Sequence, residues 1–310
     1  MVTESLADAR SRSLEALCRI LRCPECRQGM LVSRSDELLC CEACQQRYPV
    51  IEGVPFLFEA KVLDDYVAAD RSTERPLPAW PTRVRGGAYH WREYRIEELL
   101  PPVEEARRVL LLGCGDSGER PYLNERGFEV VAFDIKRTSG TDFVADAHLL
   151  PLQDASFDVV ISMQVLEHLH SPWIAVGEIA RVLRPGGWFV GSVAFLKPYH
   201  KSYFHMTHMG VMRLLDEAGL RTDRVAGAQS LAYTLYGGMV PLGSRPVRRA
   251  LLGAFDRALH GVRAGAWTLR RRISADQRTD RFRVGLPLSF REYDHLVRAP
   301  AIVFRAQKDV

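Results

Sequence analysis

The sequence has little lysine, no long apolar run and no internal repeat, and each absence excludes a class of protein. Only five of its 42 basic residues are Lys, a skew toward Arg that reflects genome composition better than it indicates nucleic-acid binding. No eighteen consecutive residues are apolar and uncharged, and the N-terminus lacks the apolar core of a signal peptide. We therefore expect a globular, cytoplasmic protein rather than a membrane, secreted or fibrous one.

The charge is unevenly distributed along the chain. With 310 residues, 47% hydrophobic and 26% charged, the sequence is long enough for one large α/β core and a smaller module. Between Arg245 and Arg283 there are eleven Arg, three Asp and neither Lys nor Glu, which is a net charge of +8. Since the whole chain carries +4, the remainder carries −4. The basic character is therefore local.

Four cysteines follow a metal-binding pattern. Cys23-Pro-Glu-Cys26 and Cys41-Glu-Ala-Cys44 are two CxxC pairs separated by fourteen residues, and each pair places two thiolates on one tight turn. Two such turns complete a tetrahedral zinc site with no vacant position for water, so its predicted role is structural or in recognition. The alternative is a set of buried free thiols. The adjacent Cys40 is expected to face away on a strand and is not counted as a ligand.

The residues that follow these cysteines extend the pattern. Tyr48-Pro-Val-Ile-Glu-Gly-Val-Pro55 begins four residues after Cys44. Together, these features resemble the small zinc-ribbon family of activator subunits of tRNA and protein methyltransferases. The resemblance implies that the ribbon stabilises a methyltransferase by covering an apolar edge, here within one chain. A substrate-recognition module is the alternative.

From Tyr89 onward, the sequence alternates between apolar runs and amphipathic segments. The runs Val109–Leu112, Glu129–Phe133 and Phe157–Met163 predict buried strands, and Pro172–Leu183 predicts an amphipathic helix. Strands and helices that alternate through short loops are typical of parallel strands with crossover helices. The predicted fold class is therefore a doubly wound α/β fold.

This alternation divides the chain into three regions. Residues 1–59 are predicted to form a short helix and the zinc ribbon, and residues 60–87 a linker. Residues 88–310 form the main α/β domain, with a basic helical insertion at about 230–295 before the last strand.

A glycine-rich turn follows the first predicted strand of this domain. The glycines of Gly113-Cys-Gly115 let the chain turn sharply and bring backbone N–H groups close to a ligand at the carboxyl edge of the sheet. Alone, this turn would equally suit a dinucleotide. Asp134 ends the next strand, where it can accept hydrogen bonds from a ribose diol. Asp146 follows a third, short strand at Val144, where it can accept a hydrogen bond from an adenine amino group.

Four further runs occur in order and with consistent spacing: Asp146–Leu152, Ser156–Ile161, Val165–Leu169 and Glu178–Gly187. They closely resemble the class I S-adenosylmethionine-dependent methyltransferases. The resemblance implies a seven-stranded, mostly parallel sheet that binds S-adenosyl-L-methionine. The cofactor-binding residues that it implies are Gly113, Cys114, Gly115, Asp134, Ile135, Asp146, Ala147 and Gln164.

Catalysis by such an enzyme places modest demands on the protein. A sulfonium is a good leaving group, so the main tasks are to align the acceptor and exclude water, and a base is needed only for a weakly acidic acceptor. His205 and His168 are the candidate bases, because both are expected near the carboxyl edge of the sheet. The alternatives are structural, since residues 204–207 suit a helix cap and the Glu167-His168 pair recurs across acceptor types in the resembling family.

Three functions remain open at this stage. The first is methylation, on oxygen, of a small molecule or sugar-containing metabolite, whose anionic group the arginines of the insertion would recognise. The second is methylation of RNA, gripped by the ribbon and the insertion. The third is a non-catalytic, zinc-dependent module that binds a partner. The insertion is also consistent with a helix docked on the domain or with a peripheral membrane contact. No oligomeric state is indicated.

Overall fold

The computed structural model describes most of the chain outside the basic region. The described residues are 14–72, 96–115, 119–196, 202–228, 299 and 301–309, with single positions at 254, 257, 258, 261 and 262. The predicted insertion at about 230–295 lies outside the described residues, apart from those single positions.

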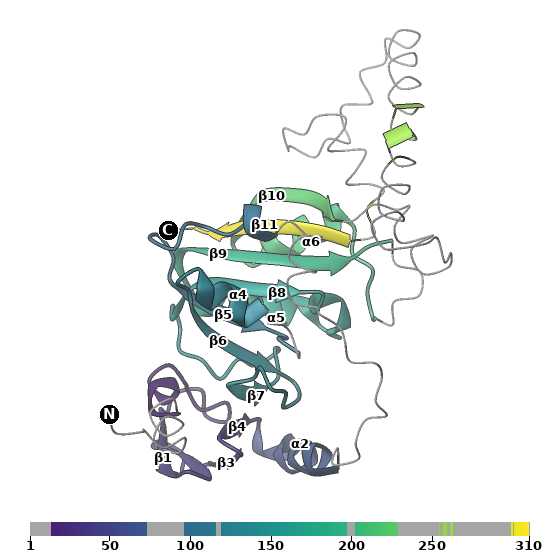
Figure 1. Cartoon of the computed structure of the whole chain (residues 1–310). Coiled ribbons are helices and arrows are strands. Elements are labelled where there is room, and N and C mark those ends of the chain that lie inside the picture. The colour runs from purple at the N-terminus through teal and green to yellow at the C-terminus, as the bar shows by residue number, and fades with distance from the viewer. Residues whose placement is uncertain are drawn as a thin grey trace.

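Strands and helices alternate along the described chain (Figure 1). The strands are β1 (Leu31–Ser35), β2 (Leu38–Cys41), β3 (Arg47–Ile51), β4 (Val54–Leu57), β5 (Arg108–Leu112), β6 (Glu129–Asp134), β7 (Phe143–Ala145), β8 (Phe157–Met163), β9 (Leu183–Ala194), β10 (Leu220–Ala228) and β11 (Ala301–Lys308). The helices are α2 (Ala60–Ser72), α4 (Glu119–Glu125), α5 (Pro172–Val182) and α6 (His208–Glu217), with 3-10 turns η1 (Ile96–Glu98) and η2 (Leu166–His168).

The strands form one sheet in the order β1-β2-β3-β4-β7-β6-β5-β8-β9-β11-β10. From β4 to β9, every neighbouring pair is parallel, whereas β11 is antiparallel to both β9 and β10. The first four strands pair antiparallel with one another. Because parallel strands share one direction, the carboxyl ends of β7, β6, β5 and β8 meet at one edge of the sheet.

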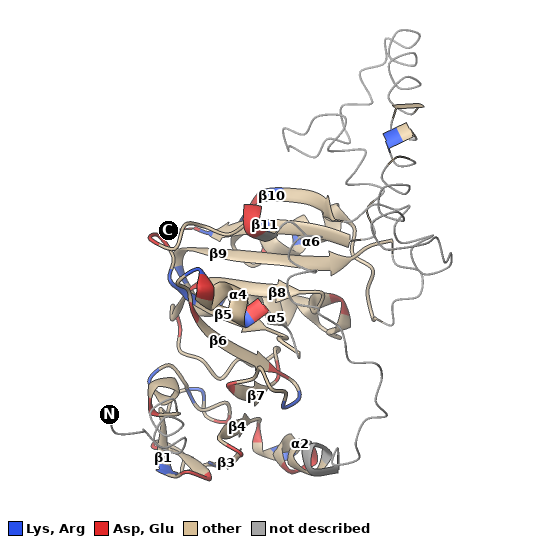
Figure 2. Ribbon diagram, in the orientation of Figure 1, with Lys and Arg blue, Asp and Glu red and all other residues tan. Residues whose placement is uncertain are grey.

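Core residues cover both faces of the sheet. Along β5, Leu110 and Leu112 pack in a cluster with residues of α5, α6 and the ribbon, whereas Val109 and Leu111 pack in a second cluster with α4. Figure 2 shows β8, β9 and β11 without charged residues along most of their length. Strands covered on both faces are expected to be apolar in this way. The predicted doubly wound arrangement is therefore present.

The continuous sheet has eleven strands, so the predicted count of seven applies to β5 to β11 but not to the sheet as a whole. The four additional strands, β1 to β4, belong to the ribbon, which the sequence analysis treated as a separate module. The β3–β4 hairpin turns through Glu52 and Gly53, with φ of 50° and 82°, and such positive φ values are typical of a two-residue type I′ turn. This tight turn sends β4 alongside β7, where Phe56 pairs with Val144 in parallel. Backbone pairing merges the ribbon with the main sheet.

The linker predicted at residues 60–87 begins as a helix. Residues 60–72 form α2, which contacts β4. The backbone N–H at the first residue of α2, Ala60, donates to Glu25 Oε2 at 2.9 Å. This bond anchors the start of α2 on the first cysteine turn. In the described part of the chain, no helix combines the length and the hydropathy needed to cross a membrane.

Candidate cofactor and metal-binding sites

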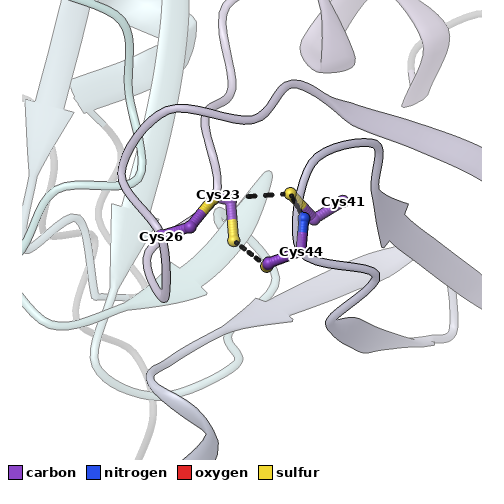
Figure 3. A group of neighbouring side chains, drawn as sticks. All are labelled: Cys23, Cys26, Cys41 and Cys44. Carbon is purple, nitrogen blue, oxygen red and sulfur yellow. Dashed lines mark hydrogen bonds between the residues drawn. The ribbon is translucent and has the colours of Figure 1, made fainter.

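The four predicted cysteine ligands converge on one point. Their sulfur atoms all lie within 4.8 Å of one another, and Figure 3 shows the side chains pointing toward a common centre. The Sγ atoms of Cys23 and Cys44 are 3.7 Å apart, and those of Cys26 and Cys41 are 3.6 Å apart. Four sulfurs around one zinc ion would be separated by roughly 3.8 Å, given Zn–S bonds of ~2.3 Å. The cluster therefore has the dimensions of a tetrahedral thiolate site.

Backbone geometry shapes both cysteine turns for negatively charged sulfur. Arg27 and Gln45, each directly after the second cysteine of its pair, have φ of 58° and 62°. The N–H groups of Gln28 and Gly29 bond the thiol of Cys26 and lower its pKa to about 6. A side chain on Gly29 would overlap the sulfur of Cys41, so this position needs glycine. Both turns are thus built to hold thiolates, the form that binds metal.

The same centre is joined to the interior. Tyr48 is fully buried, and its hydroxyl lies 3.0 Å from Cys23 Sγ, where it can donate to a thiolate. Burial raises the pKa of the Cys23 thiol to about 12. A bound cation would offset this cost of ionising a buried thiol.

An ion network connects the first cysteine turn to α5. Arg27 donates to Glu178 Oε1 at 2.9 Å, and Arg181 donates to both carboxylate oxygens of Glu178. Glu178 Oε2 also accepts the N–H of Leu150 at 2.9 Å, and Arg181 donates to the Leu150 carbonyl at the same distance. Arg181 holds the pKa of Asp154 below its ordinary value through a 2.6 Å hydrogen bond. The loop after β7 is therefore fastened to the ribbon on one side and α5 on the other.

At the carboxyl edge of the sheet, the glycine turn is fixed against the next strand. Gly113 and Gly115 have φ of 69° and 49°, and a side chain on Gly113 would overlap Val165. The Gly115 N–H donates to Asp134 Oδ2 at 2.8 Å, and its carbonyl accepts from Thr138 Oγ1 at 2.7 Å. Among the described residues, and apart from its chain neighbours, no atom lies within 4 Å of where a Cβ on Gly115 would stand. The hydrogen bonds fix the turn, and no described residue fills its outer side.

The other predicted cofactor residues lie at the same edge, although not all present a side chain. Ile135, directly after β6, is 38% exposed. Ala147 and Cys114 are buried, and burial raises the pKa of the Cys114 thiol to about 12, so these two residues can offer only backbone groups. Gln164 directly follows β8 and has φ of 57°, and its backbone N–H donates to the carbonyl of Ser192 at 2.9 Å.

Asp146 is held by a residue to which the sequence analysis gave no role. His148 approaches Asp146 Oδ1 through its backbone N–H at 2.8 Å and its ring Nδ1 at 2.6 Å. Glu178 was missed in the same way. The signals were an Asp-x-His spacing and a Glu178/Arg181 pair at i, i+3, and neither is specific without knowledge of the partners.

The two candidate bases lie on loops that meet at this edge. The Phe204 N–H donates to the Glu167 carbonyl at 3.1 Å, which brings the segment of His205 next to η2, which contains His168. Both imidazoles belong to exposed residues. The structure therefore brings the neighbourhoods of His168 and His205 together beside the ends of β8 and β9.

The structural reading of residues 204–207 is confirmed in part. Thr207 is the N-cap of α6, and its Oγ1 accepts the Gly210 N–H at 3.1 Å. The Met206 N–H donates to the Ala194 carbonyl at 2.8 Å. Capping is thus carried out by Thr207, and the exposed His205 is not needed for it.

Comparison with known proteins agrees with this geometry. Residues 110–191 match a family model described as a methyltransferase domain, and they contain β6, β7, β8 and most of β5 and β9. Residues 110–191 are therefore similar to methyltransferase domains. An uncharacterized methyltransferase of Mycobacterium bovis is 42% identical over 124 residues, which cover 37% of this chain and 45% of the relative.

Two further matches have lower sequence identity to this chain. The malonyl-acyl-carrier protein O-methyltransferase of Enterobacter lignolyticus is 36% identical over 96 residues, covering 28% of this chain and 38% of that protein. The chain thus spans less than half the length of these two curated relatives. A solved complex of the Haloferax volcanii Trm112 methyltransferase activator with a protein described as a methyltransferase matches with a TM-score of 0.45 and 17% identity, over 81% of this chain and 97% of that one.

Proposed function

We propose that this protein binds S-adenosyl-L-methionine at the carboxyl edge of β7, β6, β5 and β8, and transfers its methyl group to an oxygen of a small molecule. The acceptor class that we propose is a metabolite carrying a sugar or an anionic group. The main support is the fixed pairing of the Gly115 N–H with Asp134, on a turn whose outer side no described residue fills, in a region that matches a methyltransferase domain.

The residues at this edge suit each part of the cofactor. Asp134 accepts one backbone N–H on each carboxylate oxygen, from Gly115 and Lys136, and each oxygen retains a lone pair for a ribose hydroxyl. The exposed apolar side chain of Ile135 suits the face of an adenine ring. Oδ2 of Asp146 suits the adenine amino group. The open side of Gly115 suits the methionine part.

The reaction then depends on placement and on one proton. The cofactor supplies a methyl group on a sulfonium, which is already a good leaving group. The residues around Gln164 and the 202–207 loop would orient the acceptor and exclude water. His205, exposed beside this edge, would take the proton of an acceptor hydroxyl, with His168 as the second candidate.

Loss of Asp134 tests the cofactor site. Asp134→Ala is expected to weaken binding of S-adenosylhomocysteine by about 100-fold, because two hydrogen bonds to a charged acceptor are removed. Titration calorimetry measures this affinity. Asp216→Ala, which removes an exposed carboxylate on α6, is the matched control and should bind as the unmodified protein does. Equal affinity in Asp134→Ala would contradict the proposed site.

Loss of the His205 imidazole tests the base. His205→Ala is expected to lower turnover of a hydroxyl acceptor by about 10²–10⁴-fold and to leave cofactor affinity unchanged, because a base acts only on the acceptor proton. Single-turnover methyl transfer and calorimetry report the two quantities separately. Full turnover in His205→Ala would contradict this assignment, and loss in His168→Ala instead would move the role to His168.

For the four cysteines, we propose a structural Zn²⁺ ion. The sulfur separations near 3.7 Å and the N–H groups directed at Cys26 and Cys41 support this choice. All four positions of a tetrahedral ion would be filled by protein, so the ion would stabilise the ribbon rather than take part in methyl transfer.

A further inference from the structure

His148 belongs to a chain of hydrogen bonds that runs from the Asp146 carboxylate to the start of α5. Its ring Nδ1 lies 2.6 Å from Asp146 Oδ1, and its ring Nε2 lies 3.3 Å from the backbone nitrogen of Ser171. The imidazole is stacked on that of His170, with ring centroids 4.1 Å apart and planes 12° from parallel. Its side chain is only 13% exposed. The ring is therefore held on two edges and one face.

The partners of this ring determine which nitrogen carries the proton. The Ser171 nitrogen is a backbone N–H and can only donate, so His148 Nε2 must present a lone pair. In the neutral imidazole, the proton then resides on Nδ1, which donates to Asp146. The bonds thus assign the Nδ1–H tautomer.

This tautomer controls which atom of Asp146 can meet a ligand. Oδ1 already accepts two hydrogen bonds, from the backbone N–H and the ring of His148. A carboxylate oxygen has two lone pairs, so Oδ1 is saturated. Oδ2 is the remaining acceptor, and rotation of the carboxylate is blocked by both bonds. Since the side chain is 39% exposed, a ligand at the edge of the sheet can reach this carboxylate.

We propose that His148 is a positioning residue that makes the cofactor site selective for a 6-amino purine. By fixing the Asp146 carboxylate, His148 leaves Oδ2 as the single acceptor for the ligand. A purine that donates a hydrogen bond from its 6-position therefore binds more tightly. A purine without that amino group leaves the acceptor unpaired and binds more weakly. This inference rests on the proposed binding of S-adenosyl-L-methionine, and it adds the residue that enforces recognition of the base.

The test compares two ligands that differ only in the amino group. S-adenosylhomocysteine and its analogue with unsubstituted purine in place of adenine are titrated by calorimetry into the unmodified protein and into variants. The unmodified protein is expected to prefer the adenine ligand by about tenfold or more, as for one hydrogen bond to a charged group. In His148→Ala, the carboxylate can rotate, and the preference is expected to fall to about twofold or less.

Two further variants separate positioning from general structural damage. His148→Asn retains a donor near the place of Nδ1 and should restore most of the preference, whereas a purely structural loss would not be rescued. His170→Ala removes the stacked ring but leaves both bonds to Asp146, so its preference should stay within about twofold of the original.

The outcomes distinguish this inference from the proposed function. Absence of S-adenosylhomocysteine binding in the unmodified protein would overturn the proposed function itself. Binding of both ligands with equal affinity would show that Asp146 does not read the amino group. A full preference for adenine in His148→Ala would overturn the role of His148 alone.

Discussion

Cys41→Ser is expected to release the metal and to lower the stability of the whole protein by about 3 kcal/mol or more, as for other losses of structural metals. That change corresponds to a fall in unfolding temperature of roughly 6–12 °C. The effect should not be confined to the ribbon. Cys41, Leu39 and Tyr48 belong to the same buried cluster as Phe143 and Leu110 of the methyltransferase domain. One transition, at a lower temperature, is therefore expected.

Metal content by emission spectroscopy and thermal unfolding by calorimetry measure the two parts of this prediction. Cys40→Ser is the matched control, because Cys40 is buried next to Cys41 and lies outside the four-sulfur cluster. It should retain the metal. A Cys41→Ser protein that keeps both its metal and its unfolding temperature would contradict the zinc assignment. Two separate transitions would contradict the shared core.

Gly113→Ala is expected to abolish cofactor binding, with a loss of about 100-fold or more in affinity. The new methyl group would overlap Val165, and φ of 69° adds strain of about 1–2 kcal/mol for a residue with a Cβ. The turn must move to relieve both, and the Gly115 N–H would then leave Asp134. Calorimetry with S-adenosylhomocysteine measures the loss.

Gly177→Ala provides the control for this substitution. Gly177 lies in α5, and in the described part of the chain no atom outside the helix's own nearby backbone lies within 4 Å of where its Cβ would stand. Alanine there should leave affinity unchanged and raise stability by up to ~1 kcal/mol, through helix propensity. Normal cofactor affinity in Gly113→Ala would show that the glycine turn does not approach the ligand closely.

Much of the candidate site could be predicted because its residues belong to short sequence patterns. Each CxxC pair forms its own turn, Gly113 and Asp146 each follow directly on a strand, and Asp134 ends one. These turns and strand ends can be predicted because residues close together in the sequence form them. Once the strands were expected to be parallel, the meeting of their carboxyl ends followed from geometry.

The residues that escaped prediction act through distant partners. His148 depends on the backbone of Ser171, 23 residues away, and Glu178 on Arg27, 151 residues away. A histidine two positions after an aspartate, or a Glu/Arg pair on a helix, has many ordinary explanations. Only the approach of the partner turns such a pair into a functional contact.

The sequence by itself determined the fold class, the similarity to methyltransferases, the four-cysteine cluster and the glycine-aspartate edge, because side-chain type and spacing carry that information. Tertiary structure alone decided that the ribbon is part of the same sheet. The parallel pairing of Phe56 with Val144 is made by backbone N–H and C=O groups. Every residue except proline has both groups, so the type of side chain does not predict this pairing. Tertiary structure also decided how the His148 ring is held against Asp146 Oδ1, because its other nitrogen meets the backbone N–H of Ser171 only where α5 begins beside it.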